Sequence, residues 1–348
     1  MADVPVAVFA FNRPEMLRAQ LARLARVSPR DLFVVVDGPR GEADAVAVDA
    51  VHEVLHHAIT WDADVRTLLR TENLGCQASV QEGLDWVFAQ VDRAVILEDD
   101  VEVAPGFFDF AEQALRAYAD DPRAGLVSAK NALIEYSPDG RGAFLSLRGA
   151  IWGWATWASR WQHYRARFAA EEARLQARIA ATAPPLLGRV HIRFLQRRSW
   201  DVDDDWTASW ASWCSAHGWA SVTPARNMAM NVGFSDSATH TSVSGDLRGA
   251  YPAVAEVRSP GVPAPAQITW DDSYAEAFTL LDLVVLYDQP RRWRLLAKAA
   301  SSRDDVSDAV DLMLAPWRDQ QRTRSVLEHL GAYMRNDHLD ELRAAFGC

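Results

Sequence analysis

Three adjacent carboxylates, Glu98-Asp99-Asp100, directly follow the apolar run Val95-Ile96-Leu97. Such a run predicts a buried strand, so the acidic triplet is expected at its carboxyl end. Neighbouring carboxylates there repel one another and lose hydration. A divalent cation relieves both costs, because Mg²⁺ and Mn²⁺ prefer oxygen ligands and bind few carboxylates together with substrate phosphates. The triplet indicates a metal and phosphate site; an acidic turn that caps the next helix is the alternative.

Two more polar clusters follow predicted strands. Asn12-Arg13 comes after the apolar run Val4–Phe11, and Asp37-Gly38 comes after Leu32–Val36. In open α/β sheets, ligands bind at the carboxyl ends of the strands, so three clusters there predict one shared ligand site. The chain has neither a GxGxxG fingerprint after its first strand nor a GxxxxGK[ST] loop, which disfavours a dinucleotide site and a P-loop.

The elements that must position these clusters alternate along the first part of the chain. Strands are expected at residues 4–11, 32–36, 65–69, 94–97 and 125–129, and helices from Pro14 and at 43–58, 76–90 and 105–119. Strands that alternate with helices predict an α/β fold with a mostly parallel, Rossmann-like sheet flanked by helices and joined by right-handed crossovers.

The later part of the chain has a different pattern. Tryptophans are dense over residues 143–240, and helical leucine patterns begin near residue 270. The proline-rich stretch 259–266 between them marks a predicted boundary. We therefore expect a main domain over residues 1–260 and a helical C-terminal region over 265–348.

Composition narrows the class of partner. With 49% hydrophobic and 24% charged residues, the 348-residue chain is expected to be soluble and globular. A net charge of -11 disfavours nucleic acid, which binds basic surfaces. The three cysteines are far apart, no apolar run reaches about 18 residues, and the N-terminus lacks a signal-peptide pattern. These features predict a cytoplasmic protein without a transmembrane segment and leave peripheral membrane contact open.

Several motifs together resemble the GT-A-fold glycosyltransferases. Within them the sequence looks closest to bacterial family-2-like sugar transferases and to the N-acetylglucosaminyltransferase that starts complex N-glycans. The resemblance spans roughly residues 4–245 and is carried by Val8–Pro14, Asp37-Gly38, Glu72–Gly75, Ile96–Phe108, Trp152–Trp157, Asp204-Asp205-Trp206 and Ser237–His240.

The resemblance implies a GT-A fold with a nucleotide-sugar-binding half at residues 1–130 and an acceptor half at 131–260. It implies that the nucleoside-diphosphate sugar is held by Phe11, Asn12, Arg13, Asp37, Asn73, Gly75, Glu98 and Asp99. Asp100 would ligate Mn²⁺ or Mg²⁺, and His240 would be a second contact to the metal or diphosphate. A polar loop residue is the alternative for His240.

The implied reaction is an inverting transfer of the sugar to an acceptor hydroxyl. Asp205 would be the general base, with Asp204 or Asp203 as alternatives, since clustered carboxylates raise one another's pKa. Trp152 and Trp154 would stack on an acceptor sugar or pack in the core. Glycans, lipid-linked sugars and small molecules all remain open as acceptors.

Three other functions compete with this interpretation. His52-Glu53-Val54-Leu55-His56 matches the zinc motif HExxH, but it lacks the extended metzincin pattern and fits an exposed helix surface. A sugar-nucleotide nucleotidyltransferase shares the α/β plan, yet such enzymes usually open with a glycine-rich loop that Phe11–Pro14 lacks. A non-catalytic glycan-binding module would use the tryptophan-rich half and leaves the carboxylates unexplained.

Overall fold

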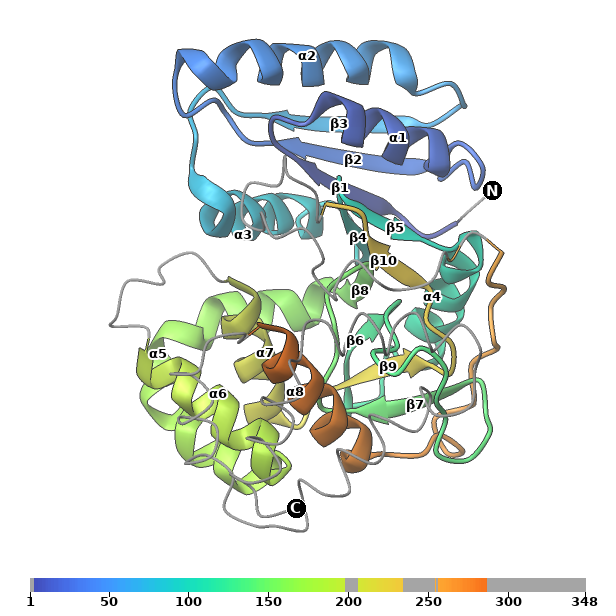
Figure 1. The fold of residues 1–348 in the computed structure, drawn as a ribbon, viewed down its shortest axis with the longest axis vertical. Coiled ribbons are helices and arrows are strands. Elements are labelled where there is room, and N and C mark those ends of the chain that lie inside the picture. Colours follow the sequence, from blue (N-terminus) through green and yellow to red (C-terminus); the bar gives the residue numbers. More distant parts are fainter. Residues whose placement is uncertain (1–2, 198–205, 234–253, 255, 287–348) are drawn as a thin grey trace, which may run out of the picture.

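The computed structural model describes residues 3–197, 206–233, 254 and 256–286 of the chain. Its centre is a sheet with the strand order β3-β2-β1-β4-β8-β6-β9-β7, flanked by helices (Figure 1). The first half alternates strands and helices in sequence order: β1 (Val6–Ala10), α1 (Pro14–Leu24), β2 (Asp31–Val36), α2 (Glu42–Ala58), β3 (Asp64–Leu69), α3 (Gly75–Phe88) and β4 (Arg93–Glu98). These elements match the predicted ranges within a few residues.

The second half extends the sheet and adds a helical layer. Its elements are β5 (Val101–Val103), α4 (Pro105–Ala117), β6 (Ala124–Ser128), β7 (Ala143–Ser146), β8 (Trp154–Trp157), α5 (Ala158–Thr182), α6 (Pro185–Arg197), α7 (Trp206–His217), β9 (Ala220–Pro224), β10 (Ala229–Asn231) and α8 (Asp272–Leu286). Strands β5 and β10 form a separate antiparallel pair.

Strand direction confirms a mostly parallel sheet. β1 pairs in parallel with β2 and β4, β2 with β3, and β6 with β9. β8 is inserted antiparallel between β4 and β6, and β7 is an antiparallel edge. The sequence analysis missed β8, because its four residues lie in the run of tryptophans and show no alternation of polar and apolar side chains.

The core has two layers because the sheet buries both of its faces. In β2, Leu32, Val34 and Val36 pack toward α1 and α2 in one cluster, whereas Phe33 and Val35 pack toward α3 in the other. Strands covered on both sides read as continuous apolar runs, which is why β1, β2 and β4 could be recognised in the sequence.

The predicted boundary, residues 259–266, is hydrogen-bonded to the main domain. The Tyr118 hydroxyl donates to the Pro263 carbonyl at 2.6 Å, and the Arg123 guanidinium donates to the Pro265 carbonyl at 2.7 Å. Beyond this stretch, the Ala132 amide donates to the Tyr274 hydroxyl on α8 at 2.9 Å. The division into 1–260 and 265–348 stays a prediction, and residues 287–348 lie outside the described part. Within the described part, no helix is both long and apolar enough to cross a membrane.

Replacement of Trp161 by Ala tests the tryptophan-rich layer. Trp161 on α5 is fully buried against α3 and α7. Its indole Nε1 donates to Asp85 Oδ1 at 2.7 Å. We expect Trp161→Ala to lower the free energy of unfolding by about 3–5 kcal/mol, the cost of a large core cavity. Urea unfolding measures this loss. Trp86→Ala, at a half-buried ring on α3, is the control, and equal losses in both variants would contradict this description of the core.

Candidate functional site

The acidic triplet lies at the carboxyl end of β4, next to the carboxyl end of β1. The chain progresses from β1 to β2 and β3 on one side and places β4 on the other, so the strand order reverses here. Arg13, directly after β1, contacts the triplet. Its Nη1 donates to Asp100 Oδ2 at 2.9 Å, and its Nη2 donates to Asp99 Oδ1. The predicted convergence of Arg13 with Asp99 and Asp100 is therefore present in the structure.

The triplet carries more negative charge than Arg13 neutralises. Asp99 is 2% exposed, and burial raises its pKa to about 7; Arg13 opposes this rise and Asp100 adds to it. Burial also raises the pKa of Glu98 to about 8, and repulsion from Asp100 and Asp99 contributes. The surroundings of the triplet are thus an electrostatic environment in which a further cation would be stabilised.

Asp37 and Asn73 form a second polar pair at the ends of β2 and β3. Asp37 Oδ1 accepts the backbone N–H groups of Gly38 and Leu74, both at 3.0 Å. Asn73 Nδ2 donates to Asp37 Oδ2 at 3.0 Å, while its Oδ1 accepts the Gly75 amide at 3.1 Å. Gly75 has a φ of 77°, a conformation that glycine adopts without strain. Burial raises the pKa of Asp37, and the two amides oppose that rise.

Phe11 and Asn12 lie at the same edge and contact the start of α2. Asn12 Nδ2 donates to Asp44 Oδ1 at 2.8 Å, and the Arg40 guanidinium lies 5.1 Å from the centre of the Phe11 ring. Arg40 also pairs with Asp44 at 2.6 Å. The sequence analysis missed Arg40 and Asp44, because no motif marks them and only the β2–α2 turn brings them beside β1.

The segment after β10 closes on Asp100. The Val232 amide donates to the Asp100 carbonyl at 2.8 Å, and Asn231 Nδ2 lies 3.4 Å from Asp100 Oδ1. Gly233 approaches so closely that a Cβ there would collide with the Asp100 carboxylate. Sequence reasoning missed Asn231 and Gly233. The only signal was a glycine that soon follows two apolar residues. A local sequence pattern does not show that this segment contacts a residue 131 positions earlier in the chain.

The two candidate acceptor tryptophans have different surroundings. Trp154 is 1% exposed on β8 and packs against Trp206 and Trp210, so the alternative of core packing describes it and its assignment to acceptor binding is corrected. Trp152 is half-buried, and the Lys130 ammonium lies 3.8 Å from its ring centre. Lys130 is itself buried just beyond β6, at the same sheet edge as the triplet. The acceptor role of Trp152 stays a prediction.

Four predicted residues cannot be placed. Asp203, Asp204, Asp205 and His240 lie outside the described residues. The general base and the second metal contact therefore remain predictions.

Asp100 is the described residue best suited to hold a divalent ion. Its carboxylate lies between Arg13 and Asn231 and is 13% exposed. Within the described ranges no three His, Cys, Asp or Glu side chains converge as a metal cage. A single carboxylate still fits Mg²⁺ or Mn²⁺, which commonly take their remaining ligands from substrate phosphates and water. In the HExxH segment on α2, Glu53 and His56 are exposed, and Glu53 lies 3.6 Å from His57, the residue just after the motif.

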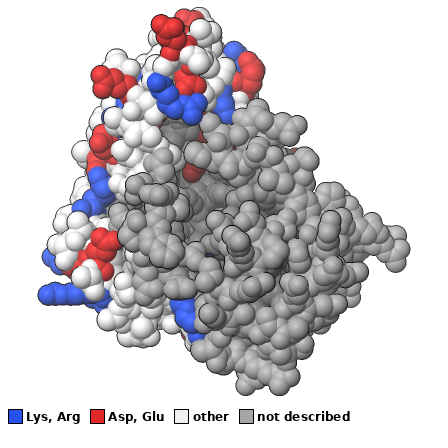
Figure 2. Space-filling model, turned by 60° about the vertical axis from the view of Figure 1, so that its left-hand side comes forward, with Lys and Arg blue, Asp and Glu red and all other residues white. Residues whose placement is uncertain are grey.

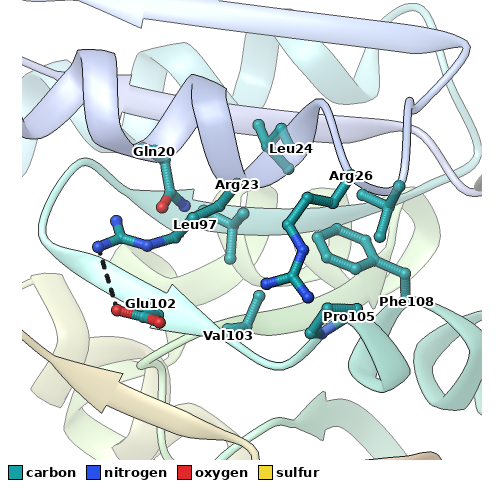
Figure 3. A pocket seen from close by; sticks show the side chains of 10 residues that line it. Gln20, Arg23, Leu24, Arg26, Leu97, Glu102, Val103, Pro105 and Phe108 are labelled. Carbon is teal, nitrogen blue, oxygen red and sulfur yellow. Dashed lines mark ion pairs between the residues drawn. The ribbon is translucent and has the colours of Figure 1, made fainter. Parts of the chain in front are cut away.

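The domain also has a small pocket, whose side chains hold neighbouring elements together. It lies between α1, β5 and α4, and Figure 3 shows the ion pair of Arg23 with Glu102 at its rim. This pair, at 3.1 Å, ties α1 to β5. None of the predicted site residues lines the pocket. Acidic and basic side chains are interspersed on the described part of the face in Figure 2.

Comparison with known proteins adds little. No model of a known protein family matches the sequence. Among solved structures, the chain is similar to a protein described as a glucose-1-phosphate thymidylyltransferase from Bacillus anthracis, in complex with sucrose. That likeness has 11% sequence identity and a TM-score of 0.28, and it covers 47% of this chain and 74% of the other. A likeness this weak assigns neither family nor activity, and the fold class follows from the sheet itself.

The raised carboxyl pKa values predict a pH dependence of stability. In the unfolded chain Glu98 and Asp99 release their protons near their ordinary pKa values of 4.5 and 3.8, whereas the folded chain retains them up to about 8 and about 7. The unfolded state therefore binds fewer protons in this window, and the triplet's contribution to stability falls as pH rises through it. Glu98→Gln removes one of these groups and is expected to flatten the fall.

Melting temperatures from about pH 4 to about pH 8, in the presence of a chelator, measure the difference between the variant and the wild type. Asp92→Asn, at a carboxylate that is 84% exposed, is the matched control. Identical slopes for Glu98→Gln and wild type would contradict the assignment.

Proposed function

We propose that this chain is a metal-dependent inverting glycosyltransferase that moves a sugar from a nucleoside-diphosphate sugar to an acceptor hydroxyl. The observation that supports it is the contact of Arg13 with Asp99 and Asp100 between β1 and β4, where the strand order reverses. Ligands of open α/β sheets bind at such points. A cationic group and under-neutralised carboxylates are suited to a diphosphate that arrives with a divalent ion.

The donor would lie along the carboxyl ends of β1, β2 and β4. The Asp37–Asn73 pair and the loop at Phe11 and Asn12 offer polar and aromatic contacts for the nucleoside end. Glu98 and Asp99 offer acceptors for sugar and ribose hydroxyls. A Mn²⁺ or Mg²⁺ ion at Asp100 would supply Lewis-acid stabilisation of the charge on the departing nucleoside diphosphate.

Two described side chains prepare Asp100 for this role. Asn231 and Arg13 contact its two carboxylate oxygens from opposite elements, which restricts its rotamer. Arg13 can turn from the carboxylates to the diphosphate, because the same guanidinium pairs with either anion. Such preorganisation supports leaving-group departure without reorganisation of the site.

The acceptor would enter from the tryptophan-rich half. Trp152 and Lys130 line the same sheet edge, two strands from the triplet. Asp205, or its neighbour Asp204, would take the proton of the attacking hydroxyl as general base. In an inverting transfer the acceptor oxygen attacks opposite the leaving group, so base and metal act on opposite sides of the sugar.

Asp100→Ala tests the metal's position. We expect slow Mn²⁺-dependent release of nucleoside diphosphate from one donor of a UDP-, GDP- and dTDP-sugar panel, and a loss of at least about 100-fold in the variant, the scale of a lost leaving-group contact. Asp92→Ala, at an exposed carboxylate, is the control. Calorimetry with the same panel measures the binding of a donor that is not hydrolysed in the absence of an acceptor.

The products of that assay separate the candidate functions. Nucleoside diphosphate indicates glycosyl transfer, whereas pyrophosphate made from a sugar phosphate and a nucleoside triphosphate would indicate a nucleotidyltransferase. Failure to release or bind any donor, with metal or without it, would contradict the proposal and favour a glycan-binding module.

A further inference from the structure

The edge strand β3 combines exposed apolar side chains with an open backbone edge. It ends the strand order and, among the described residues, pairs only with β2 (Figure 1). Among the described residues, two of the exposed large apolar side chains, Val65 and Leu69, lie in β3 and a third, Leu74, follows it, whereas Val46 lies on α2. Proteins protect an edge with charged side chains, proline or a bulge; residues 64–69 carry the charges of Asp64 and Arg66 but have neither proline nor a bulge.

The backbone hydrogen bonds define which residues face outward. The amides of Asp64 and Arg70 donate to the Arg30 and Val36 carbonyls, on the side of β2. Because N–H and C=O groups alternate in direction along a strand, Val65, Thr67 and Leu69 aim theirs away from β2. The side chains of Val65 and Leu69 also share one face of the sheet, at 37% and 40% exposure.

We propose that β3 pairs antiparallel with β3 of a second copy of this chain, about a two-fold axis at Thr67. Thr67 then faces Thr67 of the second copy, and Val65 faces Leu69, so the outward backbone groups of all three residues are hydrogen-bonded. On the other face, Asp64 of each copy lies opposite Arg70, whose guanidinium also pairs with Glu82 at 3.2 Å within its own copy. Apolar and charged groups are both complementary in this arrangement.

Small shifts from this register are unfavourable for the backbone or for the charges. A shift by one residue places outward groups against inward ones and breaks the ladder. A shift by two residues sets Arg66 directly opposite either Arg66 or Arg70 of the second copy. Like charges opposite one another destabilise a strand pair. Because the strand is complementary to itself in one register, a second copy fits it better than an unrelated strand.

The test is the mass of the full-length chain by sedimentation over a range of concentrations. Wild type is expected to dimerise. Val65→Lys and Leu69→Glu each place a charge against an apolar side chain twice across the axis, and each is expected to raise the dimer dissociation constant roughly tenfold or more. The double variant places lysine opposite glutamate and is expected to restore the dimer. Both positions are exposed in the monomer, so its folding should be retained.

Thr67→Pro provides a second disruption. It removes an outward N–H group that makes no bond to β2, so the monomer should melt normally while the dimer is lost. Thr67→Cys, in a Cys76→Ser and Cys348→Ser background, should form an intermolecular disulfide at the axis. A wild type that is monomeric at every concentration would overturn the proposal, as would a dimer that persists in Val65→Lys and Thr67→Pro or a double variant no better than the single ones. This inference does not depend on the proposed function.

Discussion

The ion pairs of Arg13 with Asp99 and Asp100 are the constraint on which the candidate site depends. Three successive carboxylates at the end of a buried strand are unfavourable unless positive charge compensates them. Arg13 supplies part of that charge from the neighbouring strand and joins the ends of β1 and β4. Burial, with repulsion from the neighbouring carboxylates, still keeps the pKa values of Glu98 and Asp99 high. In the proposed function, a cation bound with the donor would compensate these carboxylates further.

The sheet makes this arrangement possible because its parallel strands end together. Asn12 and Arg13, Asp37, Asn73 and the triplet are far apart in sequence, yet they follow β1, β2, β3 and β4 at one edge. The rigid apolar layers on both faces hold these strand ends in place. The pair β5–β10 then brings Asn231 to Asp100, so the second half of the chain completes a site that the first half begins.

The two edge strands of the sheet differ in how far the rest of the described chain covers them. At the β7 end, the bridge between Leu145 and Trp270 and the helix α8 continue the packing of the domain. At the β3 end, the outward backbone groups have no partner strand in the described chain. The same parallel order that gathers the polar loops thus leaves one edge suited to pairing between copies.

The sequence by itself determined the alternation of strands and helices over residues 4–129 and the polar residues at the strand ends, because buried parallel strands are continuous apolar runs and their loops carry the ligand contacts. It also marked Asn12-Arg13, Asp37-Gly38 and the triplet as one group, to which the family resemblance added Asn73. Only the tertiary structure decided the antiparallel insertion of β8, the burial of Trp154 in the core and the approach of Asn231 and Gly233 to Asp100. These features depend on pairing between distant segments. A local hydrophobic pattern shows that a segment is buried, but it does not show which distant strand it pairs with.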